Sequence, residues 1–287
     1  MHSNPITLED LVERTIDLPS LPAAAMAIVR ETEHPSASAR TIAQYVAQDQ
    51  ALAARILRLA NSSYYGLSRQ VMDVSDAVVI LGMRCIRNLC MVASTYPWVV
   101  NPSNGYGFGP KEIWTHSFAV GVGAQIVADR SGVGQRDQAL TAGLMHNLGK
   151  MALGVWHEKD MPAVMALAGS ANMTAEAAEC HILGYSHCEV GRHMAEAWNL
   201  PKPLVEVMGY HHDPNSCPSD NPLVDCVHVA DYLTMSMGLG LGGDGSRYDF
   251  HPESLTRLGI HESSLEGLAN ECEAAYARHE KLYELAA

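Results

Sequence analysis

The first hundred residues carry apolar positions at helical spacing and predict five or six short helices. Leu52, Ile56 and Leu59 fall on one face of the segment 50–60, as expected for a helix that packs against others. The predicted helices start after Thr7, cover 23–32, 39–47 and 50–60, and run from Ser75 to Leu81 and from Arg84 to about Thr95. We expect Thr7, Asp49 and Ser75 to cap their helices, because their side-chain oxygens can accept the unpaired N–H groups of a first turn.

A stretch rich in glycine, proline and asparagine between Pro97 and Pro110 indicates a linker between two halves of the chain. Beyond it, the pattern predicts helices at 111–131 and 137–151, one ending at Trp198, one at 203–212, one after Pro222 and a last one from Ser263 to about Tyr283. The sequence therefore predicts an all-α fold, in which an N-terminal helical bundle (1–105) packs on a C-terminal helical bundle (106–287).

Composition agrees with a helical protein. Hydrophobic residues make up 47% of the 287 residues and aromatic residues only 6%, which suits helix-on-helix packing better than a sheet. The net charge of −13 disfavours binding to nucleic acid, which requires clustered lysine and arginine, and to anionic membrane surfaces. We therefore expect no nucleic-acid partner and no membrane partner.

Two further features predict a cytoplasmic location. The seven cysteines are odd in number and scattered without a CxxC pair, which is typical of reduced and mostly buried thiols. The start of the chain lacks the basic and apolar segments of a secretory signal, and no apolar run approaches the roughly 18–20 residues needed to span a bilayer.

The segment 143–150 (GLMHNLGK) places His146 beside Asn147 in an apolar stretch. Further groups that could converge on it are His116, His187, the pair His211 and His212, and His228 with Asp231. A single histidine on an apolar helix face is usually a hydrogen-bonded interior residue, and His116 alone is well explained in that way. The whole set predicts a polar pocket that is either a metal site or a former one. We expect His181 and His193 to lie at the surface or behind the ligand residues, because nothing in the pattern requires them as ligands.

The residues around Gly121 and Gly123 belong to the helix predicted at 111–131, on which His116 shares a face with Gly123. Glycine lowers the stability of an exposed helix. These two positions therefore indicate that another helix approaches closely.

Three motifs in the first half resemble the HDOD domain, a bacterial signalling module related to the HD superfamily of metal-dependent phosphohydrolases. They are residues 18–22 (LPSLP), 49–62 (DQALAARILRLANS) and 77–82 (AVVILG), with the arginines that follow. The resemblance runs from about residue 18 to 237 and implies that the C-terminal bundle is HD-like.

This resemblance also implies a set of metal ligands, because HD proteins deliver histidines and aspartates from successive helices in the same order. The matching positions are His116, His146, Asn147, His187, His211 or His212, and Asp231. Imidazole and carboxylate donors suit a divalent iron, zinc, manganese or nickel ion. Adjacent residues on a helix diverge by about 100°, so the sequence leaves open which of His211 and His212 faces the pocket.

Asn147 is a departure from the family pattern, since active HD enzymes have aspartate at this position. An amide lacks the negative charge with which that aspartate bridges two ions. A second departure follows His212: the segment 213–218 (DPNSCP) lacks the loop of the cyclic-dinucleotide phosphodiesterases called HD-GYP. Hydrolysis of cyclic di-GMP is therefore not expected.

Lys150 has two interpretations. It either complements the dipole at a helix C-terminus or contacts a phosphate beside the metal. For the whole chain, we expect a non-catalytic regulatory module, without catalytic residues, that acts through signalling proteins on separate chains or through a bound small ligand. The alternatives are a metal-dependent phosphohydrolase acting on a nucleotide or phosphoester, and a passive module that uses the histidine pocket as a receptor site.

Overall fold

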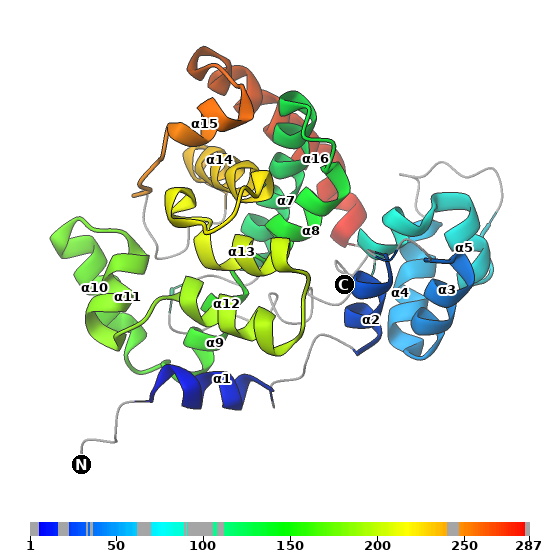
Figure 1. The fold of residues 1–287 in the computed structure, drawn as a ribbon, viewed down its shortest axis with the longest axis horizontal. Coiled ribbons are helices and arrows are strands. Elements are labelled where there is room, and N and C mark those ends of the chain that lie inside the picture. The colour runs from blue at the N-terminus through cyan, green and yellow to red at the C-terminus, as the bar shows by residue number, and fades with distance from the viewer. Residues whose placement is uncertain are drawn as a thin grey trace. The chain divides into compact units, whose positions relative to one another are not determined.

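The computed structural model describes residues 6–16, 23–32, 34, 37–61, 70–88, 90, 106–107, 112–239 and 247–284. All regular structure within these ranges is helical (Figure 1), which confirms the predicted all-α class. Cα packing divides the chain into two compact units, one formed by 1–18 with 99–273 and one by 19–98 with 274–287. The LPSLP segment and most of the linker predicted between Pro97 and Pro110 lie outside the described residues, so the division at residue 105 stays a prediction.

In the described part of 19–98, four short helices match the sequence pattern closely. They are α2 (Ala23–Thr32), α3 (Ala39–Ala47), α4 (Gln50–Ala60) and α5 (Val74–Leu81), and residues 83–88 are also helical. Helix α3 packs against α2, α4 and α5, and its Ile42 is fully buried together with Ile28 and Ile56. Burial of one apolar face per helix therefore holds this unit together.

The caps of these helices were predicted with one error. Asp49 accepts a hydrogen bond from the backbone N–H of Leu52 at 3.0 Å, as expected. The start of α5 was assigned to Ser75, but Asp73 is the N-cap and accepts from the N–H of Asp76 at 2.9 Å. Both residue types cap helices well, so the residue type alone does not distinguish Asp73 from Ser75. With Asp73 as the cap, the first turn of α5 contains the buried Val74 and Ala77. Gly82 ends α5 with a φ of 84°, a left-handed value that favours glycine.

The unit formed by 1–18 and 99–273 is built around α7 (Glu112–Ser131), which packs against α8 (Arg136–Met145) and α14 (Pro222–Ser236). Side chains are buried on all sides of α7, as expected for a helix in the middle of a bundle. The remaining helices of this unit are α1 (Leu8–Ile16), α9 (Leu148–Trp156), α10 (Met161–Ala171), α11 (Ala175–Leu183), α12 (His187–Ala197), α13 (Lys202–Tyr210), α15 (Glu253–Leu258) and the first part of α16 (Leu265–Glu284). None of the helices in the described ranges is long and apolar enough to cross a membrane.

Helix α1 belongs to this second unit although it stands at the start of the chain. Thr7 accepts a hydrogen bond from the N–H of Asp10 at 3.1 Å, which confirms the predicted cap. The helix contacts α12 and α9, and its Leu11 is fully buried. The hydroxyl of Tyr185 also donates to the carbonyl of Ile6 at 3.1 Å. The N-terminal segment is therefore fastened to helices that lie more than 130 positions later in the sequence.

Close approach of helices depends on glycines near the candidate site. A Cβ added to Gly143 would lie 2.5 Å from the Cα of Gly121, so α7 and α8 touch backbone to backbone. A Cβ at Gly123 would lie 3.2 Å from the Cβ of Ala230 on α14. These contacts confirm the close approach predicted for Gly121 and Gly123. A Cβ on Gly149 would overlap the carbonyl oxygen of His187, so α9 meets the first turn of α12 in the same manner.

We expect Gly149→Ala to destabilise the protein by about 1–3 kcal/mol, because the new methyl group must push the backbone of α12 away. The matched control is Gly169→Ala on α10, where an added Cβ meets no atom within 4 Å. That change should leave stability unchanged or raise it by up to about 1 kcal/mol, since alanine favours a helix. Chemical denaturation of the two variants measures the difference, and equal stabilities would contradict the close packing.

Candidate metal centre

His146 and Asn147 occupy a turn between two helices. The sequence predicted one helix from Asp137 to Met151, which is wrong: α8 ends at Met145, and α9 begins at Leu148. Apolar residues continue through the break, so their spacing alone gives no sign of it. The turn directs both side chains inward, and His146 is fully buried while Asn147 is 4% exposed.

His116, His146 and Asp231 form the first cluster of potential ligands, supplied by α7, the turn and α14. The Nε2 atom of His116 lies 3.0 Å from Oδ1 of Asp231, and the Nε2 atom of His146 lies 4.0 Å from the same oxygen. All three residues are at most 4% exposed. The resemblance placed these residues in one site, and the structure brings them together.

The proton position of His146 follows from its acceptor. Nδ1 of His146 lies 2.6 Å from the carbonyl oxygen of Gly143. A carbonyl can only accept, so we assign the proton to Nδ1, and Nε2 then carries a lone pair. In His116, Nδ1 lies 3.3 Å from the carbonyl oxygen of Leu239, while Nε2 faces the carboxylate of Asp231. Metal-binding histidines are oriented in this way.

Three buried polar atoms in this turn and its surroundings have no hydrogen-bond partner: Nε2 of His146, Oδ1 of Asn147 and Oδ1 of Asp231. Oδ1 of Asp231 nevertheless forms an ion pair with Nε2 of His116 at 3.0 Å. Buried polar atoms are hydrogen-bonded in the great majority of cases, so the acceptors on His146 and Asn147 require an explanation. A divalent cation takes nitrogen and oxygen lone pairs of this kind, and the residues present therefore fit a metal ion.

A second cluster lies beside the first and consists of His187, Cys188, His211 and His212. One ligand atom from each residue lies within 4.8 Å of those of the other three. Nδ1 of His187 lies 2.8 Å from the carboxylate of Glu179, and Nδ1 of His211 lies 3.1 Å from the carbonyl of Val207. The Nε2 atoms of these rings therefore carry lone pairs too. The ring centroids of His146 and His211 are 4.9 Å apart, so the clusters share one pocket.

Burial keeps His146, His211 and His212 neutral. Loss of solvent lowers the pKa of His146 to about 3, and it lowers the pKa of His211 and His212 well below the usual value. For Asp231, burial acts to raise the pKa, but the neighbouring His116 outweighs it and holds the pKa of the carboxyl well below its usual range. These three imidazoles are therefore neutral and Asp231 is ionised at neutral pH, which is the protonation state that binds a metal.

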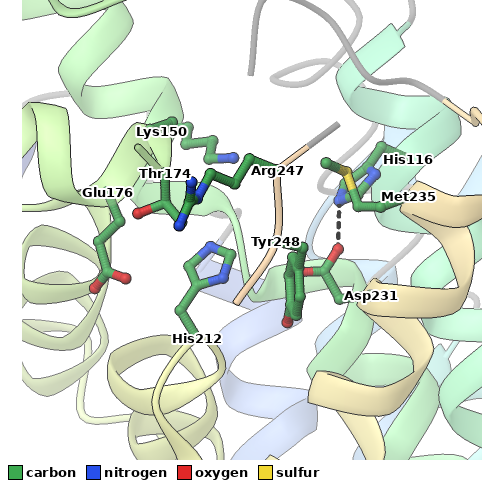
Figure 2. A pocket seen from close by; sticks show the side chains of 10 residues that line it. His116, Lys150, Thr174, Glu176, His212, Asp231, Met235, Arg247 and Tyr248 are labelled. Carbon is green, nitrogen blue, oxygen red and sulfur yellow. Dashed lines mark ion pairs between the residues drawn. The ribbon is translucent and has the colours of Figure 1, made fainter. Parts of the chain in front are cut away.

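Two residues of the first cluster, His116 and Asp231, line a small cavity of about 30 Å³. Its lining consists of His116, Lys150, Thr174, Ala175, Glu176, His212, Asp231, Met235, Arg247 and Tyr248. Figure 2 shows the ion pair of His116 and Asp231 on one side of this cavity. Lys150 and Arg247 stand on the opposite side, with their charged ends in the same region.

Lys150 does not lie at a helix C-terminus, and its predicted role as a partner of that dipole is wrong. It is the third residue of α9, near the helix N-terminus, where a positive charge is unfavourable. Its side chain is buried, with Nζ 5.9 Å from the centre of the Tyr106 ring. Lys150 instead lines the cavity, where its ammonium group can contact an anion.

His228 has a structural role, although it lies on the same helix as Asp231. Its Nδ1 donates to the carbonyl of His211 at 2.8 Å, and its Nε2 accepts from the backbone N–H of His251 at 2.9 Å. Both ring nitrogens are thus engaged within the protein. His181 is exposed and His193 is partly exposed, and neither belongs to a cluster, which agrees with the prediction.

Sequence reasoning missed Cys188 and Glu179. Cys188 directly follows a predicted ligand, and this adjacency is the one sequence signal that points to it. Glu179 is fully buried and accepts from both the backbone N–H and Nδ1 of His187, at 2.7 and 2.8 Å. The hydroxyl of Tyr106 donates to its other oxygen at 2.8 Å. Glu179 therefore fixes the direction of the His187 ring. All seven cysteines are free, and four of them are buried.

The sequence matches the family of the HDOD domain over residues 18–214. The chain belongs to the HDOD domain family. A structure of an HDOD domain protein with unknown function from Geobacter sulfurreducens is 25% identical, with a TM-score of 0.71, and the match covers 97% of this chain and 95% of that one. The two chains thus share a helical, HD-like fold, as the resemblance implied.

Two further relatives of this HDOD protein are longer than it is. An uncharacterized protein of Treponema pallidum (strain Nichols) is 27% identical over 226 residues, which covers 77% of this chain and 42% of that protein. A structure from Marinobacter aquaeolei VT8, provisionally described as a signal transduction protein, is 24% identical with a TM-score of 0.78. That match covers 96% of this chain and 61% of the other. The HDOD chain thus spans less than two thirds of either relative.

We expect His228→Phe to destabilise the HDOD protein by about 2–4 kcal/mol, because the carbonyl of His211 and the N–H of His251 each lose a buried partner. The control is His193→Ala, which removes a partly exposed ion pair with Glu196 and should cost less than about 1 kcal/mol. Thermal or chemical denaturation of both variants provides the measurement. Similar losses in the two variants would contradict a structural role for His228.

Proposed function

We propose that this HDOD protein is a non-catalytic signal-transduction module that binds one divalent transition-metal ion in its HD-type pocket. His116, His146 and Asp231 would hold the ion, and the amide oxygen of Asn147 would complete the set. The module would act through contacts with proteins on separate chains or through a bound small ligand. Two nitrogens and one carboxylate suit iron, zinc, manganese or nickel.

The observation that carries this proposal is the neutral amide of Asn147 in the turn between α8 and α9. Its unpaired Oδ1 can donate to one cation, as amide oxygens do. It cannot supply the negative charge needed to hold two cations close together, because their mutual repulsion is large at short range. Asp231 then remains as the one carboxylate of the first cluster. The single negative charge of the first cluster supports the binding of one metal ion in this cluster. It disfavours a hydrolytic mechanism that uses two metal ions.

The family and the fold support a role in signalling. HDOD proteins resemble signalling modules, and the longer relative from Marinobacter aquaeolei VT8 is provisionally described as a signal transduction protein. That description belongs to the relative, and it supports the same class of role for this chain. The pocket keeps its buried ligands, but Asn147 stands where active HD enzymes have the bridging aspartate. This combination fits a module in which the metal has a structural or sensing role.

A metal-dependent phosphohydrolase is the second candidate, and the lining of the cavity favours it. Lys150 and Arg247 place two positive charges opposite the pair of His116 and Asp231 (Figure 2). Positive groups beside a metal ion are the arrangement that stabilises a phosphoryl group during transfer. This candidate requires the single ion to activate water without a second one.

We expect protein purified without a histidine tag to contain about one equivalent of a transition metal, measured by mass spectrometry of the elements. His146→Ala and Asp231→Asn should each abolish this content, because each removes a donor with no replacement in the cluster. His193→Ala is the control and should keep the metal, since His193 belongs to neither cluster. Asn147→Asp should strengthen binding, because it adds an anion to the site.

The metal part of the proposal would be overturned by a content below about a tenth of an equivalent after loading with each of the four metals. If His193→Ala loses as much metal as His146→Ala, the metal ion binds outside this pocket.

For activity, we expect no turnover of phosphomonoesters or phosphodiesters above the level of His146→Ala, because the second ion that positions and activates water is missing. A panel of nucleotide and generic phosphate esters, assayed with each metal, provides the measurement. Turnover that disappears in His146→Ala and falls in Lys150→Met, but not in the exposed Lys159→Ala, would replace this proposal with the phosphohydrolase.

A further inference from the structure

A chain of three hydrogen bonds centred on His157 fastens the start of α1 to the rest of its unit. Nδ1 of His157 lies 2.8 Å from Oδ2 of Asp160, and its Nε2 lies 2.7 Å from the hydroxyl oxygen of Tyr185. The same hydroxyl donates to the backbone carbonyl of Ile6 at 3.1 Å. Ile6 directly precedes Thr7, the residue that caps α1, so the chain of bonds ends at the first turn of this helix.

The three contacts together require more protons than a neutral histidine carries. The carboxylate of Asp160 and the carbonyl of Ile6 can only accept, and the single proton of the Tyr185 hydroxyl is used in the bond to Ile6. His157 must therefore donate from Nδ1 to Asp160 and from Nε2 to the hydroxyl oxygen. An imidazole that donates from both nitrogens is the cation.

A neutral His157 ring keeps only two of the three bonds. With its one proton on Nδ1, the ring still donates to Asp160, but Nε2 then accepts the proton of Tyr185, and the carbonyl of Ile6 loses this donor. With the proton on Nε2, the lone pair of Nδ1 faces the carboxylate of Asp160 instead. The full set of bonds is thus specific to the protonated ring.

The position of His157 in the fold also favours the cation. His157 is the C-cap of α9, where the negative end of the helix dipole stabilises a positive charge. Asp160 adds a carboxylate 2.8 Å away, and its side chain is 55% exposed, so it remains in contact with water. The ring of His157 is only 7% exposed, so solvent screens this pair weakly from the side of the imidazole.

The other titratable side chains on the elements around His157 are exposed or engaged elsewhere. Glu189 caps its own helix by accepting from the N–H of Ser186, and Arg192 and His193 pair with Glu196. Helix α10 carries no charged residue, and Lys150 lies at the opposite end of α9. The exposed groups, whose charges water and salt screen, are Glu158 and Lys159 beside His157 and Glu9, Asp10 and Glu13 on α1.

The helices that α1 contacts carry residues of the pocket. Helix α1 packs against α12 and α9 (Figure 1). Helix α9 begins directly after Asn147, and α12 begins at His187. The chain then passes from α1 into the other compact unit at residue 19. The attachment of α1 therefore acts on two helices beside the pocket and on one of the chain links between the units.

We propose that His157, Tyr185 and Asp160 form a pH-sensitive latch that holds the start of α1. With His157 protonated, all three bonds form and the latch is closed. When the ring loses its proton, the bond to Ile6 is lost and the first turn of α1 loosens. Closing the latch takes up a proton, so by linkage the attachment is strongest at acid pH and weakens as the pH rises through the range in which histidine titrates. The latch needs no metal ion, and it adds a pH input to the regulatory role proposed above.

Hydrogen exchange of the α1 amides in the intact protein tests the latch. From about pH 5.5 to 8.5, we expect the protection of residues 11–16 to fall roughly two- to tenfold, as for the loss of one hydrogen bond. The exchange rates are first corrected for the intrinsic effect of pH on amide exchange. The amides of α7, in the middle of the same unit, provide the internal reference and should show no matching fall.

Three variants separate the latch from a merely structural contact. His157→Gln removes the titrating ring and should abolish the change with pH, whereas Tyr185→Phe removes the shared hydroxyl and should give weak protection at every pH. Asp160→Asn removes the negative charge and should move the midpoint of the change to lower pH. The matched control is His181→Gln, which alters an exposed histidine outside the chain of bonds and should keep the wild-type profile.

Nitrogen NMR of unmodified protein labelled at histidine detects the protons directly and needs no substitution to report the result. At the acid end of the range, His157 should carry a proton on both ring nitrogens. Its signal is assigned by its absence in His157→Gln or, if that variant does not fold, by its shift in Asp160→Asn. The inference is overturned if this ring stays neutral there, if α1 protection in the wild type is independent of pH, or if the wild-type fall persists in His157→Gln with native circular dichroism.

Discussion

The anchoring of histidine Nδ1 atoms is the interaction on which the rest of the pocket depends. His146 and His211 each donate from Nδ1 to a backbone carbonyl, and His187 donates to the buried carboxylate of Glu179. Each bond fixes a tautomer and a ring direction within the protein itself. The pocket is therefore ordered in advance, and an ordered pocket binds a ligand at a lower entropic cost.

The helices could be predicted where a local signal marks their ends. The bounds of α3 and α4 follow from polar caps such as Asp49 and from apolar spacing, both of which act within a few residues. The break at His146 and Asn147 has no such signal, because apolar residues continue on both sides. It becomes visible only when Gly149 meets the carbonyl of His187, a contact between segments nearly forty residues apart. The erroneous placement of Lys150 at a helix end followed from the missed break.

The resemblance was enough to name the candidate ligands. It did not predict which of them lie together in each cluster. His116, His146 and Asp231 fall in one cluster, and His187 falls in another with both members of the pair that sequence left undecided. His211 and His212 can both face the pocket because they follow the end of α13, where the helical divergence of neighbours no longer applies. Cys188 enters the pocket through the packing of α12, which no spacing in the sequence reveals.

The docking of α1 sets an order of events when the chain is made. Leu8–Ile16 is synthesised before the other described helices, but its partner α12 begins only at His187. Until α12 is made, the buried side of α1 cannot pack against it. The chain between α1 and α12 forms a long loop, and closing it costs conformational entropy that grows with the logarithm of the loop length. The unit of 19–98 waits in the same way, because its other part, residues 274–287, is made after α12. Each of the two units therefore joins segments from distant parts of the chain, and a chain truncated before α12 would leave α1 without its attachment.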